Sequence, residues 1–95
     1  MSARAVGALI RSRQTCPYCR IRITPETAVL DHIIPVALGG VHGLVNLVAC
    51  CGPCNSAKSS RDFASWLMML DPVDRARAER LYASRYGSIA QGVLL

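Results

Sequence analysis

The sequence predicts an α+β fold in which helices flank a short β-hairpin that is built around a metal site. Two C-x-x-C pairs, "CPYC" at 16–19 and "CGPC" at 51–54, are separated by the 31 residues from Arg20 to Cys50. Two short apolar segments with β-branched residues, at 28–34 and 44–49, lie between the pairs and are typical of strands. Apolar residues recur at helical spacing before the first pair and after the second.

Length and cysteine content narrow the class of protein. A chain of 95 residues forms a thin apolar core, which a metal or disulfides often supplement, and we expect residues 1–95 to form one domain. The five cysteines are an odd number and no signal peptide precedes them, which argues against a disulfide framework. No apolar run approaches the roughly 18 residues that span a bilayer, so we expect a soluble, cytoplasmic protein with no membrane partner.

The elements before the second cysteine pair are a helix and a hairpin. Ala5, Val6, Leu9 and Ile10 have helical spacing, which predicts a helix over about 2–12 with Ser2 as its cap. The strand at 28–34 ends at Pro35, and glycines at 39, 40 and 43 form a loop around His42 before the strand at 44–49. We expect the two strands to pair, with His42 as an ordinary loop residue.

Two helices are expected after the hairpin. The spacing of Phe63, Trp66, Leu67 and Leu70 predicts a helix from the second cysteine pair to about residue 70. Asp71 as N-cap followed by Pro72 predicts a second helix over 72–86 that ends at Gly87. Core positions are expected for Trp66, Leu81 and Tyr82, and solvent-exposed positions for Arg75, Arg77, Arg80 and Arg85.

Four cysteines are candidate ligands of a structural zinc ion: Cys16, Cys19, Cys51 and Cys54. Four thiolates complete a tetrahedral zinc shell, and the two-residue spacing lets each tight turn direct both sulfurs at one ion. A thioredoxin-like redox role would require a strand-helix-strand unit, which the pattern lacks. Cys50 is the spare thiol; it could replace Cys51 as a ligand, although a buried free cysteine is the preferred interpretation.

The residues between and after these pairs carry a resemblance to a known family. "DHIIPVALGG" followed by "VNLVACCGPCNSAK" resembles the HNH endonucleases, whose ββα-metal (His-Me finger) core is often framed by four zinc-binding cysteines. The resemblance covers about residues 16–61, and the flanking helices lie outside it.

The resemblance implies a role for each matching residue. His32 would be the general base, Asp31 a ligand of the catalytic metal, and Asn46 the residue that braces the loop and orients the histidine. Asn55 takes the third signature position, where many family members have histidine, so the chain resembles an H-N-N variant. A carboxylate and an amide oxygen favour a hard catalytic cation, Mg²⁺ or Mn²⁺, at Asp31 and Asn55. Asn46 as a simple turn cap and Asn55 as a helix cap are the structural alternatives.

The charge favours a polyanionic partner. The formal net charge is +5, from 11 Lys and Arg against 6 Asp and Glu, and a four-thiolate zinc site would leave about +3. Such an excess attracts DNA through its phosphates. Lys58 and Arg61, which follow Asn55, are candidates for holding phosphates, with a solvated helix face as the alternative.

These observations together predict a metal-dependent DNA endonuclease with no small-molecule substrate, and the family resemblance implies that it leaves 5′-phosphate and 3′-hydroxyl ends. One rival is a zinc-ribbon-like module that binds DNA without cutting it. A second is a nicking subunit that works with a partner, because one finger cuts one strand. The resemblance extends to small HNH proteins of phages, some of which assist genome packaging, and this implies packaging (terminase) proteins as partners.

Overall fold

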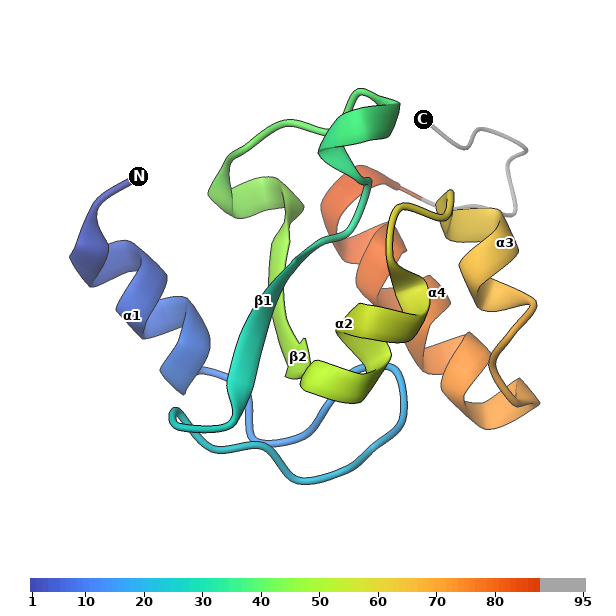
Figure 1. Cartoon of the computed structure of the whole chain (residues 1–95), viewed down its shortest axis with the longest axis horizontal. Coiled ribbons are helices and arrows are strands. Elements are labelled where there is room, and N and C mark those ends of the chain that lie inside the picture. The colour runs from blue at the N-terminus through green and yellow to red at the C-terminus, as the bar shows by residue number, and fades with distance from the viewer. Residues whose placement is uncertain (88–95) are drawn as a thin grey trace.

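The computed structural model describes residues 1–87 as a small two-stranded sheet surrounded by helices (Figure 1). The elements are α1 (Ala3–Arg11), β1 (Ala28–His32), the 3-10 turns η1 (Val36–Leu38) and η2 (Leu44–Asn46), β2 (Leu47–Cys51), α2 (Gly52–Lys58), α3 (Phe63–Leu67) and α4 (Pro72–Tyr86). The predicted α+β class and the order helix, hairpin, helices are confirmed. Within residues 1–87, no helix is long and apolar enough to cross a membrane.

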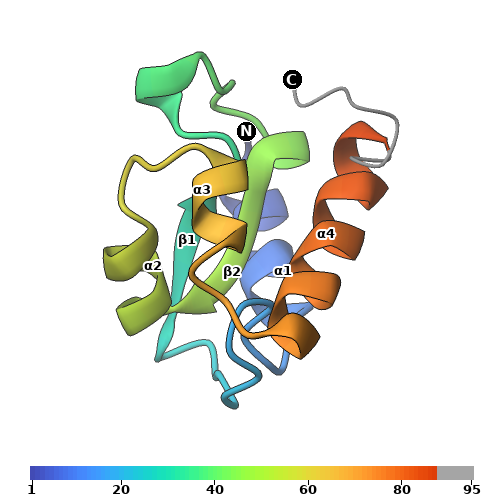
Figure 2. The ribbon, with the colours of Figure 1, turned by 90° about the vertical axis from the view of Figure 1, so that its right-hand side faces the viewer.

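The predicted hairpin forms, with antiparallel pairing from Ala28 opposite Cys51 to His32 opposite Leu47. Its bounds differ from the prediction, because β1 ends at His32 and β2 begins only at residue 47. Past His32 the backbone bonds to the turn η2 instead of continuing the ladder: the Ile33 amide donates to the carbonyl of Asn46 over 2.8 Å. All five residues of β2 are buried, and α2 and α4 lie on either side of the hairpin in Figure 2.

Capping side chains set the starts of the two flanking helices. The hydroxyl of Ser2 accepts a hydrogen bond from the amide of Ala5 over 3.1 Å at the start of α1. Asp71 accepts from the amide of Asp74 over 2.8 Å at the start of α4, and Gly87 ends that helix with φ 94°. The predicted helices at 2–12 and 72–86 are therefore confirmed to within a residue at their ends.

The single helix expected from the second cysteine pair to residue 70 is wrong, because the chain forms two helices there. α2 ends at Lys58, and Ser59 has a φ of 49°, a left-handed value that breaks the helical path. Asp62 then caps α3, accepting from the amide of Ser65 over 2.8 Å and from its hydroxyl over 2.9 Å. The break redirects α3 so that Phe63 and Trp66 face the core.

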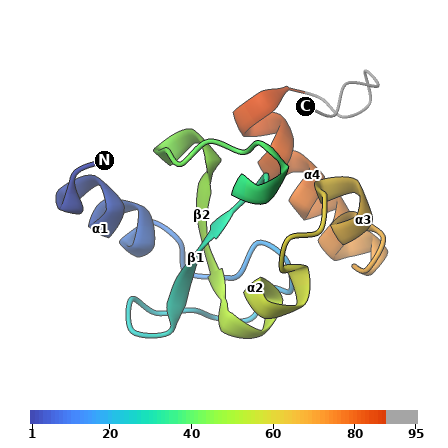
Figure 3. The same cartoon turned by 45° about the horizontal axis from the view of Figure 1, so that its top comes forward.

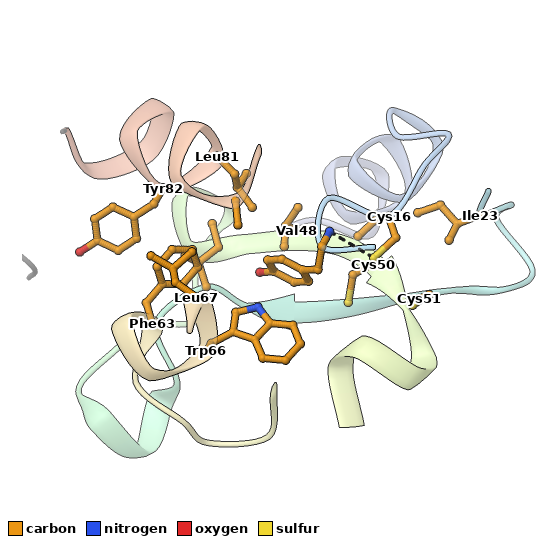
Figure 4. Close-up of a cluster of buried hydrophobic side chains, with 14 residues drawn as sticks. Cys16, Ile23, Val48, Cys50, Cys51, Phe63, Trp66, Leu67, Leu81 and Tyr82 are labelled. Atoms are coloured by element: carbon orange, nitrogen blue, oxygen red, sulfur yellow. Dashed lines mark hydrogen bonds between the residues drawn. The ribbon is translucent and has the colours of Figure 1, made fainter. Parts of the chain in front are cut away.

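The core lies where α3 and α4 meet β2. Figure 4 shows Phe63, Trp66 and Leu67 from α3 close to Leu81 and Tyr82 from α4. The Phe63 and Tyr82 rings have centroids 4.9 Å apart. Trp66 and Tyr82 are 2% and 1% exposed, so the prediction that these aromatics belong to the core is confirmed.

Two of the four arginines expected in solvent on α4 instead bind backbone carbonyls. Arg75 donates from Nε to the carbonyl of Leu67 over 3.1 Å and from Nη2 to that of Leu70. Arg85 Nη1 donates to the carbonyls of Leu44, Val45 and Leu47 at 3.1, 3.0 and 2.8 Å. The planar guanidinium offers five donors, which suits it to closing the ends of α3 and η2. Arg80 is exposed as expected.

Candidate active site and metal centre

The four predicted cysteines come together at one end of the hairpin. Cys16 and Cys19 lie in a tight turn, closed by a hydrogen bond from the Arg20 amide to the Cys16 carbonyl (3.0 Å). Cys51 ends β2 and caps α2, accepting from the Cys54 amide over 3.4 Å. The four sulfur atoms all lie within 4.8 Å of one another.

This arrangement fits a tetrahedral zinc ion. With Zn–S bonds of about 2.3 Å, tetrahedral sulfurs lie about 3.8 Å apart. The Sγ atoms of Cys19 and Cys51 are 3.6 Å apart, close to that separation. The amide of Tyr18 points at the Cys16 sulfur over 3.4 Å, an N–H···S contact that stabilises a thiolate. The four cysteines are therefore positioned to hold one metal ion, as the sequence predicted.

Cys50 does not belong to this cluster. Its side chain is 0% exposed and packs in the apolar core, while its neighbour Cys51 contributes the fourth sulfur. Burial, together with the nearby Asp31 carboxylate, raises the pKa of the Cys50 thiol above its usual range. Cys50 is thus a buried free cysteine, and of the two interpretations open from the sequence the structure supports this one.

A pocket of about 320 Å³ opens at the other end of β1, beside α2. Its walls include Asp31, His32 and Asn55, together with residues of η1 and of the turn after α2. His32 is the last residue of β1, so its side chain leaves the ladder where the chain turns away. Neighbouring strand residues point to opposite faces, and the end of the strand is what allows both Asp31 and His32 to reach one pocket.

Asp31 is held by two donors from different parts of the chain. The hydroxyl of Tyr18 donates to its Oδ2 over 2.7 Å, and the ammonium of Lys58 lies 3.2 Å from its Oδ1. Burial raises the pKa of the Asp31 carboxyl, while these two donors oppose the shift by stabilising the carboxylate. Burial and the same carboxylate raise the pKa of Tyr18 well above its usual range, so its hydroxyl remains a donor.

The expectation that Lys58 meets phosphates at the surface is not supported by its position. Lys58 is 0% exposed, and its ammonium donates to Asp31 and, over 2.7 Å, to the backbone carbonyl of His32. A buried carboxylate requires a partner, and Lys58, at the end of α2, supplies it. Arg61 is exposed, with Nε donating to the carbonyl of Ala57 over 3.1 Å.

Asn55 is free to act as a ligand. The cap of α2 is Cys51, so the alternative that Asn55 only caps this helix does not hold. Among the described residues, the Asn55 side chain makes no hydrogen bond, and it lines the pocket beside Asp31. Its amide oxygen therefore keeps both lone pairs for a substrate or a cation.

Asn46 ties the loop that follows β1. Its Oδ1 accepts from the Ile34 amide (2.9 Å), and its Nδ2 donates to the carbonyls of Ile34 (2.8 Å) and Val41 (2.9 Å). Tyr86 of α4 donates its hydroxyl to the same Oδ1 over 2.6 Å. Asn46 is 0% exposed, so these bonds join the loop to the core. Figure 3 shows the molecule with this end of the hairpin turned toward the viewer. Its side chain thus does more than cap a turn.

His42 lies beside His32 instead of standing alone in the loop. The Nε2 atom of His32 and the Nδ1 atom of His42 are 3.0 Å apart. One of the two nitrogens must carry the shared proton, since a hydrogen bond needs one donor and one acceptor. The ring contact connects the glycine loop directly to the end of β1.

Three contacts in this site were not predicted from the sequence: His42 with His32, and Tyr18 and the buried Lys58 with Asp31. His42 lies four residues before Asn46 in the same glycine loop, and that proximity was the available signal. Tyr18 sits between two cysteines of the candidate metal site, where an aromatic residue gives no indication of a partner 13 residues away. The pairing of Lys58 with Asp31 depends on where α2 ends, which spacing alone does not specify.

Comparison with known proteins agrees with this geometry. The family described as HNH endonuclease matches residues 16–65, which is more than half of the chain. The chain belongs to the HNH endonuclease family. The matched segment contains both cysteine pairs and all of the hairpin, so the HNH match and the folded core coincide.

Relatives of this HNH chain include a much larger enzyme. The CRISPR-associated endonuclease Cas9 of Actinomyces naeslundii is 46% identical over 52 residues, which cover 54% of this chain and 5% of that protein. The crystal structure of the Type II-C Cas9 enzyme from the same organism matches with a TM-score of 0.60 and 31% identity, over 81% of this chain and 9% of that one. The HNH chain thus spans a small fraction of the length of these relatives.

Proposed function

We propose that the chain is a DNA endonuclease that hydrolyses phosphodiester bonds at the pocket beside β1. The observation that carries this proposal is the meeting of Asp31, His32 and Asn55 on the walls of one pocket. A general base and oxygen ligands for a divalent cation are groups that can catalyse hydrolysis of a phosphodiester there. Membership of the HNH endonuclease family supports the reaction class, and the choice of DNA follows from the resemblance and the basic charge.

His32 acts as the general base in this proposal. A proton on Nε2, donated to His42 Nδ1, leaves the lone pair on Nδ1 of His32 available. This nitrogen takes a proton from water as the water attacks phosphorus, which an imidazole can do near neutral pH. The bond to the 3′ oxygen then breaks and that oxygen takes up a proton from solvent, giving 5′-phosphate and 3′-hydroxyl ends. Asn46 keeps the loop that carries His42 in place.

Asp31 and Asn55 would hold one hard divalent cation, Mg²⁺ or Mn²⁺. The donor set fits, because each Asp31 oxygen keeps a lone pair beyond its bond to Tyr18 or Lys58, and the Asn55 amide is unpaired among the described residues. When bound, such a cation neutralises the charge that develops on the phosphate oxygens. The zinc site, at the opposite end of the hairpin, holds the fold together and takes no part in the chemistry.

The decisive test is cleavage of supercoiled plasmid by the parent and His32→Ala proteins in Mg²⁺ and in Mn²⁺. The parent should give nicked and then linear forms, and His32→Ala should be slower by roughly 10²- to 10⁴-fold, the usual contribution of a general base. Zinc content and DNA affinity of His32→Ala should match the parent, because His32 contacts neither metal in this proposal. Equal rates for the two proteins would remove His32 from the mechanism.

Asn55→Ala tests the cation site with little cost to folding. The Asn55 side chain makes no hydrogen bond within residues 1–87, so its loss should leave stability nearly unchanged. The Mg²⁺ concentration for half-maximal cleavage should rise, since a ligand is lost. Asp31→Ala is the poorer probe, because it also leaves the buried Lys58 ammonium without its carboxylate partner.

The rival interpretation, a zinc-stabilised module that binds DNA without cutting it, makes the opposite prediction. In that case the parent binds plasmid but leaves it supercoiled in every divalent ion. We favour catalysis because a binding module has no need for His32 and Asn55 at one pocket. Residues 1–95 acting as one domain, nicking of a single strand, and packaging (terminase) partners stay predictions from the sequence.

A further inference from the structure

A second pocket, of about 250 Å³, lies between α4 and the segment that leads into the first cysteine pair. It is lined by Arg13, Pro17, Arg77, Arg80, Leu81 and Ser84. Three of these six residues are arginines, from two parts of the chain that are far apart in sequence. No residue of the proposed cleavage pocket contributes to it.

The positive charge in this pocket is poorly compensated. Within residues 1–87, neither Arg13 nor Arg80 has a hydrogen-bond or ion-pair partner. Burial, followed by the charges of Arg85 and Arg77, lowers the pKa of Arg13, while Tyr18 and Cys16 oppose the shift. Such a cluster is unfavourable on its own and favours the binding of an anion.

The acid that pairs with Arg77, Asp74, is shared with Arg20. Asp74 Oδ1 lies 2.7 Å from Nε of Arg20 and only 3.6 Å from Nη1 of Arg77. That Arg77 nitrogen is buried and has no hydrogen-bond acceptor among the described residues. A buried guanidinium N–H without an acceptor is costly, and a ligand oxygen would satisfy it.

We propose that Arg13, Arg77 and Arg80 bind a backbone phosphate of DNA, at a point separate from the bond that is cut. Planar guanidinium groups match phosphate oxygens with paired, charge-assisted hydrogen bonds. Figure 2 shows α4, which carries Arg77 and Arg80, on the opposite side of the hairpin from α2, which carries Asn55. The phosphate held here therefore belongs to a different stretch of DNA from the one at His32. This inference rests on the proposed function, since it takes DNA as the ligand.

The test measures DNA affinity across salt concentrations in a His32→Ala background, where binding is separated from cleavage. The pocket variant is Arg77→Ala/Arg80→Ala, and the matched control is Arg4→Ala/Arg11→Ala, which removes the same charge from the exposed side chains of α1. Loss of one phosphate contact lowers the slope of log affinity against log salt by about 0.9. When salt rises from about 50 to about 200 mM, the DNA affinity of the pocket variant should thus fall by a factor about 3.5 times smaller than the factor by which the parent's affinity falls.

The control should keep most of the parent's slope, and Arg80→Lys should keep more of it than Arg80→Ala. Equal slopes for the pocket and control variants would overturn the proposal, because affinity would then follow total charge alone. An unchanged slope combined with loss of zinc from the Arg13→Ala or pocket variant would also overturn it, since the arginines would then only balance the nearby thiolates.

A direct probe is inorganic phosphate, followed through the arginine Nε–H signals in NMR spectra of the zinc-loaded protein. Signals of Arg13, Arg77 and Arg80 should shift together and saturate, while that of Arg4 should not. No shift at any pocket arginine would contradict the proposal. Plasmid cleavage by the parent is measured separately. If the parent does not cut DNA but the pocket variant still shows the smaller salt slope, the proposed endonuclease activity is contradicted and the phosphate-binding pocket is not.

Discussion

The imidazoles of His32 and His42 are joined, with Nε2 of the first 3.0 Å from Nδ1 of the second and the rings tilted by 41°. This contact links the end of β1 to the glycine loop, in addition to the backbone hydrogen bond between Ile33 and Asn46. A histidine whose Nε2 is occupied as a donor presents Nδ1 as its only acceptor. His42 can therefore fix both the orientation and the proton position of His32.

Replacing His42 should slow cleavage without abolishing it. His42→Ala removes the hydrogen-bond partner of His32 Nε2, and a neutral hydrogen bond contributes about 0.5–1.5 kcal/mol, so we expect kcat to fall roughly 2- to 13-fold. His42→Asn places an amide group near the position of Nδ1 and should retain more activity than His42→Ala. Single-turnover plasmid cleavage at saturating Mg²⁺ measures both rates. A loss as large as that of His32→Ala would instead make His42 a base in its own right.

Gly40 should tolerate no side chain, in contrast to Gly43 in the same loop. A Cβ on Gly40 would lie 1.8 Å from the Ile34 carbonyl oxygen and 2.8 Å from Nδ2 of Asn46. Since backbone must shift, Gly40→Ala should cost about 1–3 kcal/mol of the free energy of unfolding and also reduce cleavage. A Cβ on Gly43 meets nothing within 4 Å, and its φ of −157° is ordinary extended backbone. Urea unfolding of the two variants measures the difference, and equal stability would contradict this account of the loop.

Local patterns predicted the parts of the fold that depend on neighbouring residues. The caps at Ser2 and Asp71 and the pairing of two apolar segments depend on residues a few positions apart, and these predictions are confirmed. The helix expected to run to residue 70 was wrong, because Ser59 and the Asp62 cap override an unbroken apolar period. Periodicity records which residues face the core and is insensitive to a change of axis between two helices.

In the candidate site, too, the features that depend on nearby residues were predicted and those that depend on distant residues were not. Spacing within the cysteine pairs was enough to predict four sulfurs around one ion, and the structure brings those sulfurs together. The partners of Asp31 were not predictable, because Tyr18 and Lys58 lie 13 and 27 residues away and meet it only in the folded chain. The candidate residues could therefore be identified from the sequence, whereas the hydrogen bonds that orient them depend on the fold.

Zinc should be needed for folding. Metal analysis should find about one Zn²⁺ per chain, and Cys54→Ser should lose the ion and much of the cooperative unfolding transition, because the energy of metal binding is folding energy in such sites. The matched control is Cys50→Ala, which removes a neighbouring buried sulfur that lies outside the cluster. Cys50→Ala should keep full zinc content, at the cost of some core packing. A folded, zinc-free Cys54→Ser protein would show that the cluster does not stabilise the chain.

Removing the Lys58 ammonium should unfold the protein more readily than removing an exposed charge. Lys58 and Asp31 are 0% and 4% exposed with 3.2 Å between Nζ and Oδ1, so Lys58→Met leaves a buried carboxylate whose remaining donor is the Tyr18 hydroxyl. Breaking a buried pair in this way costs about 3–5 kcal/mol, whereas Arg61→Ala, at an exposed position, should stay within about 0.5 kcal/mol. The double variant Asp31→Asn/Lys58→Met should recover part of the loss, because neither charge is then left unpaired in the core.

Urea unfolding at saturating zinc gives the free energies of unfolding of the parent and the three variants. DNA binding of the folded proteins should weaken for Arg61→Ala alone. If Lys58→Met is as stable as the parent but binds DNA poorly, its ammonium reaches the surface and the buried pair is not its main role.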